Sequence, residues 1–396
     1  MTLLRRLAAA AMLLAAAALP AAGCSSILDP RPTTTAVVHC ADPHGLELII
    51  GAHRDAPEPT LDPTLVCQIT AAIRAGETVQ IVAVSGQPRL ITVRLESVTG
   101  GTLAQQNSPR LQQDVQRVLT AIAAARPDAP GIDDLEALSI AADAARTAGD
   151  PHAELVLIDS GLDDRGALDF TAPGMIAATP AEVALQLRES GNLPDLRGFA
   201  VELIGIGYTT PPQAPLSDKW RANVTQIWAA VVTSAGAAAE IIPQPGQGPS
   251  IITSQPVRTV PVPPARPVRL HVGTTIIFTQ ESPVRFEPDS TVFIDPAAAV
   301  RALTPIARWL AEDRSRHAWL EGTTADVGPM SGQIALSRLR AEHVRAELIA
   351  LGAAGGQIST SGVGSDFPQF TPDRNASGIL LAGPAALNRS VRITLN

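Results

Sequence analysis

The sequence predicts two globular domains, one of the α/β class and one of the α+β class, joined by a proline-rich linker. Short apolar runs alternate with longer helical patterns over residues 37–242, and a second, shorter alternation fills residues 268–396. Between them, residues 243–267 contain eight prolines. A chain of 396 residues is also longer than one hydrophobic core usually serves. We therefore expect two separate cores.

The first domain is predicted to be a doubly wound α/β fold. The run from Leu155 to Ile158 is continuously apolar, as in strands that helices cover on both faces. Strands are expected at 46–50, 79–84, 90–95, 155–158 and 199–206, with a hairpin between the second and third, and helices at 62–75, 111–125, 133–147, 179–189 and 218–236. This alternation is typical of a sheet between two layers of helices.

The helix expected at 179–189 opens with Thr179-Pro-Ala-Glu182. Proline favours the first helical turn, and glutamate three residues after threonine is typical of a capping box. The pattern therefore places Glu182 at the start of its own helix as a capping carboxylate.

The strand that ends in Ile158-Asp159-Ser160-Gly161, together with the element order, is similar to von Willebrand factor A-like domains. That family holds a metal with D-x-S-x-S after its first strand. The segment Gly51–Ala56 has no hydroxyl, and Arg54 would repel a divalent cation. The resemblance thus implies a metal-free domain, with Asp159 as a turn or capping residue.

Residues 243–267 are predicted to form a semi-rigid, extended linker. Proline-rich backbone spans about 3 Å per residue, so this segment could reach on the order of 70 Å. Its expected task is to space the two domains.

Residues 268–396 are predicted to form a βαβαββ sandwich. Strands are expected at 269–278, 318–322, 358–363 and 390–395, and amphipathic helices at 296–312 and 333–351. Gly352 suits the left-handed position after the second helix. Residues 364–388 are expected to form an irregular surface loop.

Three motifs in this domain carry a family resemblance. They are Leu320-Glu-Gly-Thr-Thr-Ala-Asp-Val-Gly328, Leu336-Ser-Arg-Leu-Arg-Ala341 and Asn388-Arg-Ser-Val-Arg-Ile393. They resemble the G-x-T-D-x-x-G, L-S-x-x-R-A and N-R-x-V motifs of the OmpA-like, peptidoglycan-associating C-terminal domain. The resemblance implies a partner, the diaminopimelate-containing stem peptide of peptidoglycan.

The resemblance also implies the binding residues. The family's arginine maps onto Arg340 and its asparagine onto Gln333, while Asn388-Arg389 would hold the final strand. The family's aspartate position is occupied by Ala325, and the nearest carboxylate is one residue later, at Asp326. Asp326 is therefore the expected, displaced partner of the ligand ammonium. A solvated helix arginine remains the alternative for Arg340.

Residues 1–23 read as a lipoprotein signal peptide. Arg5-Arg6 precede an apolar run too short to cross a membrane comfortably, and Ala21-Ala-Gly-Cys24 resembles a lipobox. This resemblance implies that Cys24 carries the lipid (palmitate) and that residues 24–36 form a tether. A cleaved signal peptide with an incidental cysteine is the alternative.

The two other cysteines, Cys40 and Cys67, are predicted to form a disulfide, because an even pair in an exported protein favours a bridge. Two buried free thiols are the alternative. Neither C-x-x-C nor H-E-x-x-H spacing occurs, so no metal site is expected.

Composition excludes other functions. The net charge is −8 and no basic patch with interleaved aromatics occurs, so nucleic acid is not an expected partner. The sequence has no G-x-S-x-G or G-x-G-x-x-G, so we expect neither an enzyme nor a cofactor.

Two functions remain. The first is an exported protein, anchored by lipid to the cell membrane and facing the cell wall or periplasm, whose OmpA-like domain associates noncovalently with peptidoglycan. The second is an envelope protein-interaction or adhesion module, in which the α/β domain binds a protein partner and the OmpA-like domain has lost its ligand.

Overall fold

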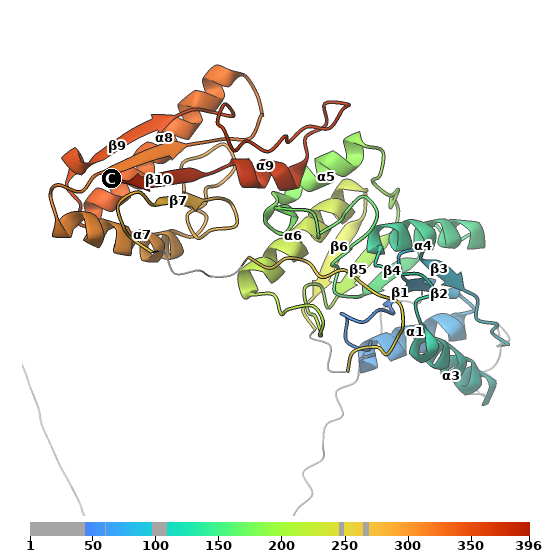
Figure 1. Cartoon of the computed structure of the whole chain (residues 1–396). Helices are drawn as coiled ribbons and strands as arrows, with labels where there is room; N and C mark the ends of the chain where they lie inside the picture. Colours follow the sequence, from blue (N-terminus) through green and yellow to red (C-terminus); the bar gives the residue numbers. More distant parts are fainter. Residues whose placement is uncertain (1–43, 60, 97–108, 245–248, 264–268) are drawn as a thin grey trace, which may run out of the picture. The chain divides into compact units, whose positions relative to one another are not determined.

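A computed structural model describes residues 44–59, 61–96, 109–244, 249–263 and 269–396 (Figure 1). The described residues belong to one compact body. We call those between 44 and 263 the N-terminal region and 269–396 the C-terminal region. The predicted signal peptide, the tether, Cys24 and Cys40 lie outside the described residues. Among the described helices, none combines the length and the apolar character that crossing a bilayer requires.

The N-terminal region is built on a six-stranded sheet in the order β3-β2-β1-β4-β5-β6. Every neighbouring pair is parallel except β2 and β3, which form the predicted hairpin. The strands are β1 (Leu46–Gly51), β2 (Val79–Val84), β3 (Arg89–Ile91), β4 (Glu154–Ile158), β5 (Ala200–Ile204) and β6 (Ala238–Ile242). The β6 strand was not anticipated, because the sequence around Ala238 lacks a long apolar run.

Helices cover both faces of this sheet (Figure 1). They are α1 (Pro63–Ala75), α3 (Pro109–Ala124), α4 (Asp134–Ala148), α5 (Pro180–Glu189) and α6 (Asp218–Ser234), with a short 3₁₀ turn, η1 (Met175–Ala177), before α5. One apolar cluster joins α1 and α3 to the sheet, and a second joins α4, α5 and α6 to it. The doubly wound α/β prediction is therefore confirmed.

The described part of the proline-rich stretch, residues 249–263, lies along the N-terminal region. The Arg258 backbone N–H donates to Asp164 Oδ2 at 2.5 Å, and the Val260 N–H donates to Gln213 Oε1 at 2.7 Å. Val260 is buried in the cluster beside α6. Extended, proline-rich backbone makes no internal hydrogen bonds, so its N–H and carbonyl groups can bond to a neighbouring surface. The sequence had predicted a spacer between the two domains instead. The exact domain boundaries stay predictions.

The C-terminal region is a four-stranded sheet in the order β7-β10-β8-β9. Its elements are β7 (Thr275–Phe278), α7 (Pro296–Glu312), β8 (Ala318–Gly322), α8 (Met330–Ala350), η2 (Gly355–Gln357), β9 (Ile358–Gly362), α9 (Ala382–Asn388) and β10 (Val391–Leu395). Strands β8 and β9 are parallel, and β10 runs antiparallel to both β7 and β8. Apolar side chains of α7 and α8 form one cluster with the sheet, which confirms the α+β sandwich.

The expected irregular loop at 364–388 is wrong in part, because its end forms α9. The Asn388 side chain fastens the preceding segment by bonding both the N–H and the carbonyl of Thr371, at 2.9 and 2.7 Å. It also donates to the buried carboxylate of Asp373 at 2.9 Å. These are contacts across 15 to 17 residues, which local sequence patterns do not show.

Candidate functional site

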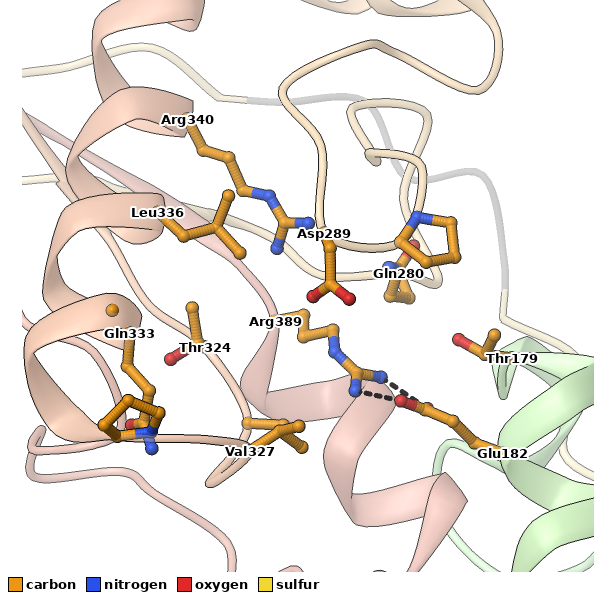
Figure 2. Close-up of a pocket in the computed structure, with 14 residues that line it drawn as sticks. Thr179, Glu182, Gln280, Asp289, Thr324, Val327, Gln333, Leu336, Arg340 and Arg389 are labelled. Carbon is orange, nitrogen blue, oxygen red and sulfur yellow. Dashed lines mark hydrogen bonds and ion pairs between the residues drawn. The ribbon is translucent and has the colours of Figure 1, made fainter.

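A pocket of about 290 Å³ lies beside the first turns of α8 (Figure 2). Its walls come from three parts of the C-terminal region and from α5 of the N-terminal region. The lining residues are Thr179, Glu182, Gln280, Pro288, Asp289, Thr324, Ala325, Val327, Pro329, Gly332, Gln333, Leu336, Arg340 and Arg389. Four of these side chains are charged, two acids and two arginines, so the pocket can bind a ligand that carries charged groups.

The pocket depends on a close approach between β8 and α8. Gly322 ends β8, and a Cβ atom at this position would lie 1.9 Å from the Ser337 carbonyl oxygen. Any side chain there would push the helix away from the strand. The glycine thus lets the loop after β8, with Thr324 and Ala325, face the helix that carries Arg340.

Arg340 is 3% exposed and holds the turn that forms the opposite wall. Its Nε donates to the Ser290 carbonyl at 2.9 Å, and its Nη2 donates to the Glu287 carbonyl at 3.1 Å. The guanidinium also lies over the Phe286 ring, 5.2 Å from the ring centroid, which is within the limit of about 6 Å for a cation–π contact. Burial, together with the charge of Arg389, lowers the pKa of Arg340 to about 10, so it stays charged at neutral pH.

The turn held by Arg340 presents an acid that the sequence analysis missed. Asp289 has φ +47°, the left-handed conformation that residues other than glycine rarely adopt. Figure 2 shows its carboxylate pointing into the pocket, near Arg340 and Arg389. Within the part of the chain that the structure describes, this carboxylate has no ion pair closer than 4 Å. The residues Pro288-Asp289 indicate a turn in the sequence, but the sequence does not show that this turn lies near Arg340.

The structure does not bring Asp326 into the pocket. Its carboxylate accepts a hydrogen bond from Gln333 Nε2 at 3.1 Å and lies 3.5 Å from Arg374 Nε. Ala325, which is 1% exposed, lines the pocket in its place. Neighbouring residues of an extended loop point in different directions, so a one-residue shift moved the carboxylate out of the site.

Gln333 lines the pocket, but its amide is already bonded to other parts of the protein. Besides Asp326, its Nε2 donates to the Gly328 carbonyl at 3.0 Å, and its Oε1 accepts from the Ser365 N–H at 3.2 Å. Gln333 therefore ties the β8–α8 loop to the segment after β9.

Arg389 reaches the pocket instead of only supporting the last strand. Its guanidinium forms a two-point ion pair with Glu182 of α5, at 2.5 and 2.8 Å (Figure 2). Thr179 makes no side-chain hydrogen bond at the start of α5. The capping-box expectation is thus wrong, because the Glu182 carboxylate pairs with a full charge in another part of the chain.

A second buried polar cluster lies at the carboxyl ends of β1 and β4. The His53 ring bonds Asp55 through Nδ1 at 2.5 Å and Asp159 through Nε2 at 2.7 Å, and all three residues are buried. Burial opposes the imidazolium charge, but the two carboxylates raise the pKa of His53 well above its ordinary value. Asp159 Oδ1 also accepts from the Ser160 backbone N–H at 2.5 Å, so Asp159 serves the turn after β4, as expected, and is an ion-pair partner of His53 as well.

His53 and Asp55 are closed off from solvent, at 1% and 0% exposure, and Asp159 borders only a small cavity of about 30 Å³. Burial and the neighbouring Asp159 and Asp163 also raise the pKa of Asp134 well above its usual range. Among the described residues, no group of His, Cys, Asp or Glu side chains is arranged to hold a metal ion. We interpret the cluster as structural.

Comparison with known proteins identifies an OmpA family domain at residues 285–378. Among solved structures, the chain is similar to the peptidoglycan-associated lipoprotein from Burkholderia pseudomallei, with 25% identity over 28% of this chain and 88% of that one and a TM-score of 0.24. It is also similar to an outer membrane protein from Borrelia burgdorferi B31 (23% identity, 32% and 92% covered, TM-score 0.24). A third is the periplasmic domain of Helicobacter pylori MotB (19% identity, 33% and 86% covered, TM-score 0.26).

No curated protein matches the chain. The family match leaves the N-terminal region uncovered, so its similarity to von Willebrand factor A-like domains stays a prediction.

Proposed function

We propose that this chain, which carries an OmpA family domain at residues 285–378, is a cell-envelope protein that binds peptidoglycan noncovalently. The observation that carries the proposal is the pocket beside α8, where the side chains of Arg340 and Asp289 face the same space. The role requires recognition of the wall and no catalytic step.

The ligand we propose is the diaminopimelate side chain of the stem peptide. Its end carries an ammonium and a carboxylate on one carbon. Such a zwitterion needs one anionic and one cationic partner at fixed positions, and charge-assisted hydrogen bonds give that recognition both energy and direction.

In this proposal Arg340 receives the ligand carboxylate and Asp289 the ammonium. Two of the Arg340 nitrogens already hold the 287–290 turn, so its remaining donors are fixed in direction. Asp289 is available because its carboxylate makes no close ion pair with any described residue. Gln333 and Asp326 shape the loop that closes the pocket.

A competition experiment tests the ligand. The purified chain is pelleted with insoluble peptidoglycan sacculi in the presence of soluble stem peptides. Peptides with diaminopimelate should displace the protein, whereas otherwise identical peptides with lysine keep the ammonium, lack the carboxylate and should act at least tenfold more weakly. Equal displacement by both peptides, or a wild-type chain that does not pellet, would rule out this ligand.

We also propose that acyl chains on Cys24 hold the exported protein on the membrane, so that it faces the wall. The support is the lipobox-like Ala21-Ala-Gly-Cys24 after a short apolar run. Stable anchoring needs more than one membrane-binding signal, which a multiply acylated cysteine provides. A Cys24→Ala chain should leave the membrane fraction in a high-salt wash; retention there would exclude the lipid anchor.

A further inference from the structure

One of the four charged side chains in the pocket comes from outside the OmpA-like part of the chain. Glu182 lies in the first turn of α5, and its carboxylate reaches Arg389 at the pocket wall. The side chains of Glu182 and Arg389 are only 22% and 13% exposed. The pair is therefore sheltered from solvent, where charges act more strongly on one another than at an open surface.

Glu182 also balances the charge of the site. Without it, the pocket would hold Arg340, Arg389 and the single acid Asp289. The two guanidiniums are close enough for Arg389 to lower the pKa of Arg340. A pocket with an excess positive charge favours an anion, whereas the zwitterion proposed above has no net charge. With Glu182, two acids face two arginines.

An ammonium group has three donors that point in different directions, so acceptors on one wall of the pocket do not reach all of them. Asp289 offers one acceptor group on one wall. The loop after β8 offers no carboxylate to the pocket, because Ala325 lines it and Asp326 is turned toward Arg374. Figure 2 shows Glu182 entering from another wall.

We propose that Glu182 is the second acid of the peptidoglycan pocket, so that the binding site is shared between the N-terminal and C-terminal regions. This inference rests on the proposed function and makes the α/β region a part of the wall-binding site. The Glu182 carboxylate keeps its two-point pair with Arg389 and uses its remaining lone pairs to accept from the ligand ammonium.

Contacts beside the pocket hold Glu182 in place. Gln186, one turn further along α5, accepts a hydrogen bond from the Ala382 N–H at the start of α9, at 2.8 Å. Ala382 is fully buried in the apolar cluster of the N-terminal region. A Cβ atom on Gly383 would lie 2.7 Å from the Pro173 carbonyl, so the two backbones approach closely there.

Lys219, the only lysine of the chain, adds a further contact. Its Nζ donates to the carbonyls of Glu281 and Ser282, both at 3.1 Å. Lys219 lies on α6, so contacts from α5, from the Pro173 backbone and from α6 each connect this part of the N-terminal region to the C-terminal region.

The test measures sacculus binding by the purified full chain and four variants. Glu182→Gln removes the charge and keeps the shape, and we expect about tenfold weaker binding, the factor for one charge-assisted hydrogen bond. Adding Ala325→Asp to Glu182→Gln supplies a carboxylate from the other wall and should restore binding. Glu189→Gln, on the exposed end of α5, is the control and should bind as the wild type. Gln186→Ala breaks the neighbouring contact without changing charge and should lose less than threefold.

The outcomes separate this inference from the proposed function. Wild-type binding that Glu182→Gln leaves unchanged would overturn the shared site while peptidoglycan binding stands. Tighter binding by Glu182→Gln would also overturn it, because Glu182 would then be an internal occupant that competes with the wall. An equal loss in Gln186→Ala, with no rescue by Ala325→Asp, would assign the effect to the contact and not to the carboxylate. A wild-type chain that does not bind sacculi would overturn both peptidoglycan binding and the shared site. Thermal unfolding of each variant confirms that it is folded.

Discussion

Glu182 and Arg389 lie 207 residues apart in the chain, and their side chains meet in a two-point ion pair at the wall of one pocket. The pair draws the α5 glutamate away from the helix terminus where its local sequence would place it. Because it joins the two sheet-containing regions at the candidate site, changes on either region are expected to affect binding.

Arg340→Lys is expected to weaken both the fold and wall binding. Lysine keeps the positive charge, but a single ammonium cannot reproduce the fixed geometry of the bonds to the Glu287 and Ser290 carbonyls. We expect a loss of about 2 kcal/mol in the free energy of unfolding, measured by denaturant titration, and at least tenfold weaker sacculus binding. Arg338→Lys, at an exposed position of α8, is the matched control.

If Arg340→Lys keeps the wild-type affinity and stability, Arg340 contributes to neither binding nor folding. It would then be the solvated helix arginine that its sequence motif left open as the alternative.

Ala325→Asp in the otherwise unchanged chain is expected to strengthen sacculus binding about tenfold. Ala325 lines the pocket, so a carboxylate there adds an acceptor for the ligand ammonium. Ala335→Asp, on the exposed face of α8, adds the same charge outside the pocket and should not strengthen binding. Sedimentation with increasing amounts of sacculi gives both affinities. Equal gains in the two variants would count against a specific site.

His53→Ala is expected to destabilise the N-terminal region by about 3 to 5 kcal/mol, because it leaves the buried carboxylates of Asp55 and Asp159 without their shared cation. Denaturant unfolding followed by circular dichroism measures the loss. A change below about 1 kcal/mol would mean that the imidazole is not charged in the folded protein.

The same cluster predicts a pH dependence. The folded pKa of His53 lies well above its ordinary value of 6.5, so the folded state holds this proton more tightly than the unfolded state. Its stabilisation is therefore complete below about pH 6.5 and declines as the pH rises through the folded pKa. The stability difference between wild type and His53→Gln should be largest near pH 6 and smaller at pH 9; a constant difference would contradict the assignment. Using the difference removes titrations of groups remote from the cluster, whereas Asp134, beside Asp159, stays coupled to it.

Cys40 and Cys67 are predicted to be disulfide-linked in the exported protein. Cys67 lies on α1, and closing the loop between the two positions would stabilise the fold by about 3.5 kcal/mol on the loop-entropy model. Intact mass after alkylation without reductant should show no alkyl group on either cysteine. Alkylation of both in folded, exported protein would exclude the bridge.

The sequence by itself determined most of the local structure. The apolar periodicity of residues 296–312 predicted α7 with its observed bounds, and β8 was predicted at Ala318–Gly322 as found. The Leu336-Ser-x-x-Arg-Ala341 motif placed Arg340 in the candidate site. These features depend on residues a few positions apart, where side-chain spacing and backbone preferences act directly.

Tertiary structure alone decided which charges share a pocket. Asp289 and Arg340 line one pocket although they lie 51 residues apart, and His53 bonds Asp159 across 106 residues. No local pattern carries that information. At Glu182 the local sequence pattern predicted the wrong partner for the carboxylate. A capping box offers the carboxylate only partial charges on backbone N–H groups, whereas a half-buried guanidinium offers a full charge and two parallel hydrogen bonds. That stronger partner exists only once the chain has folded, because Arg389 reaches α5 through the packing of α9 against the N-terminal region.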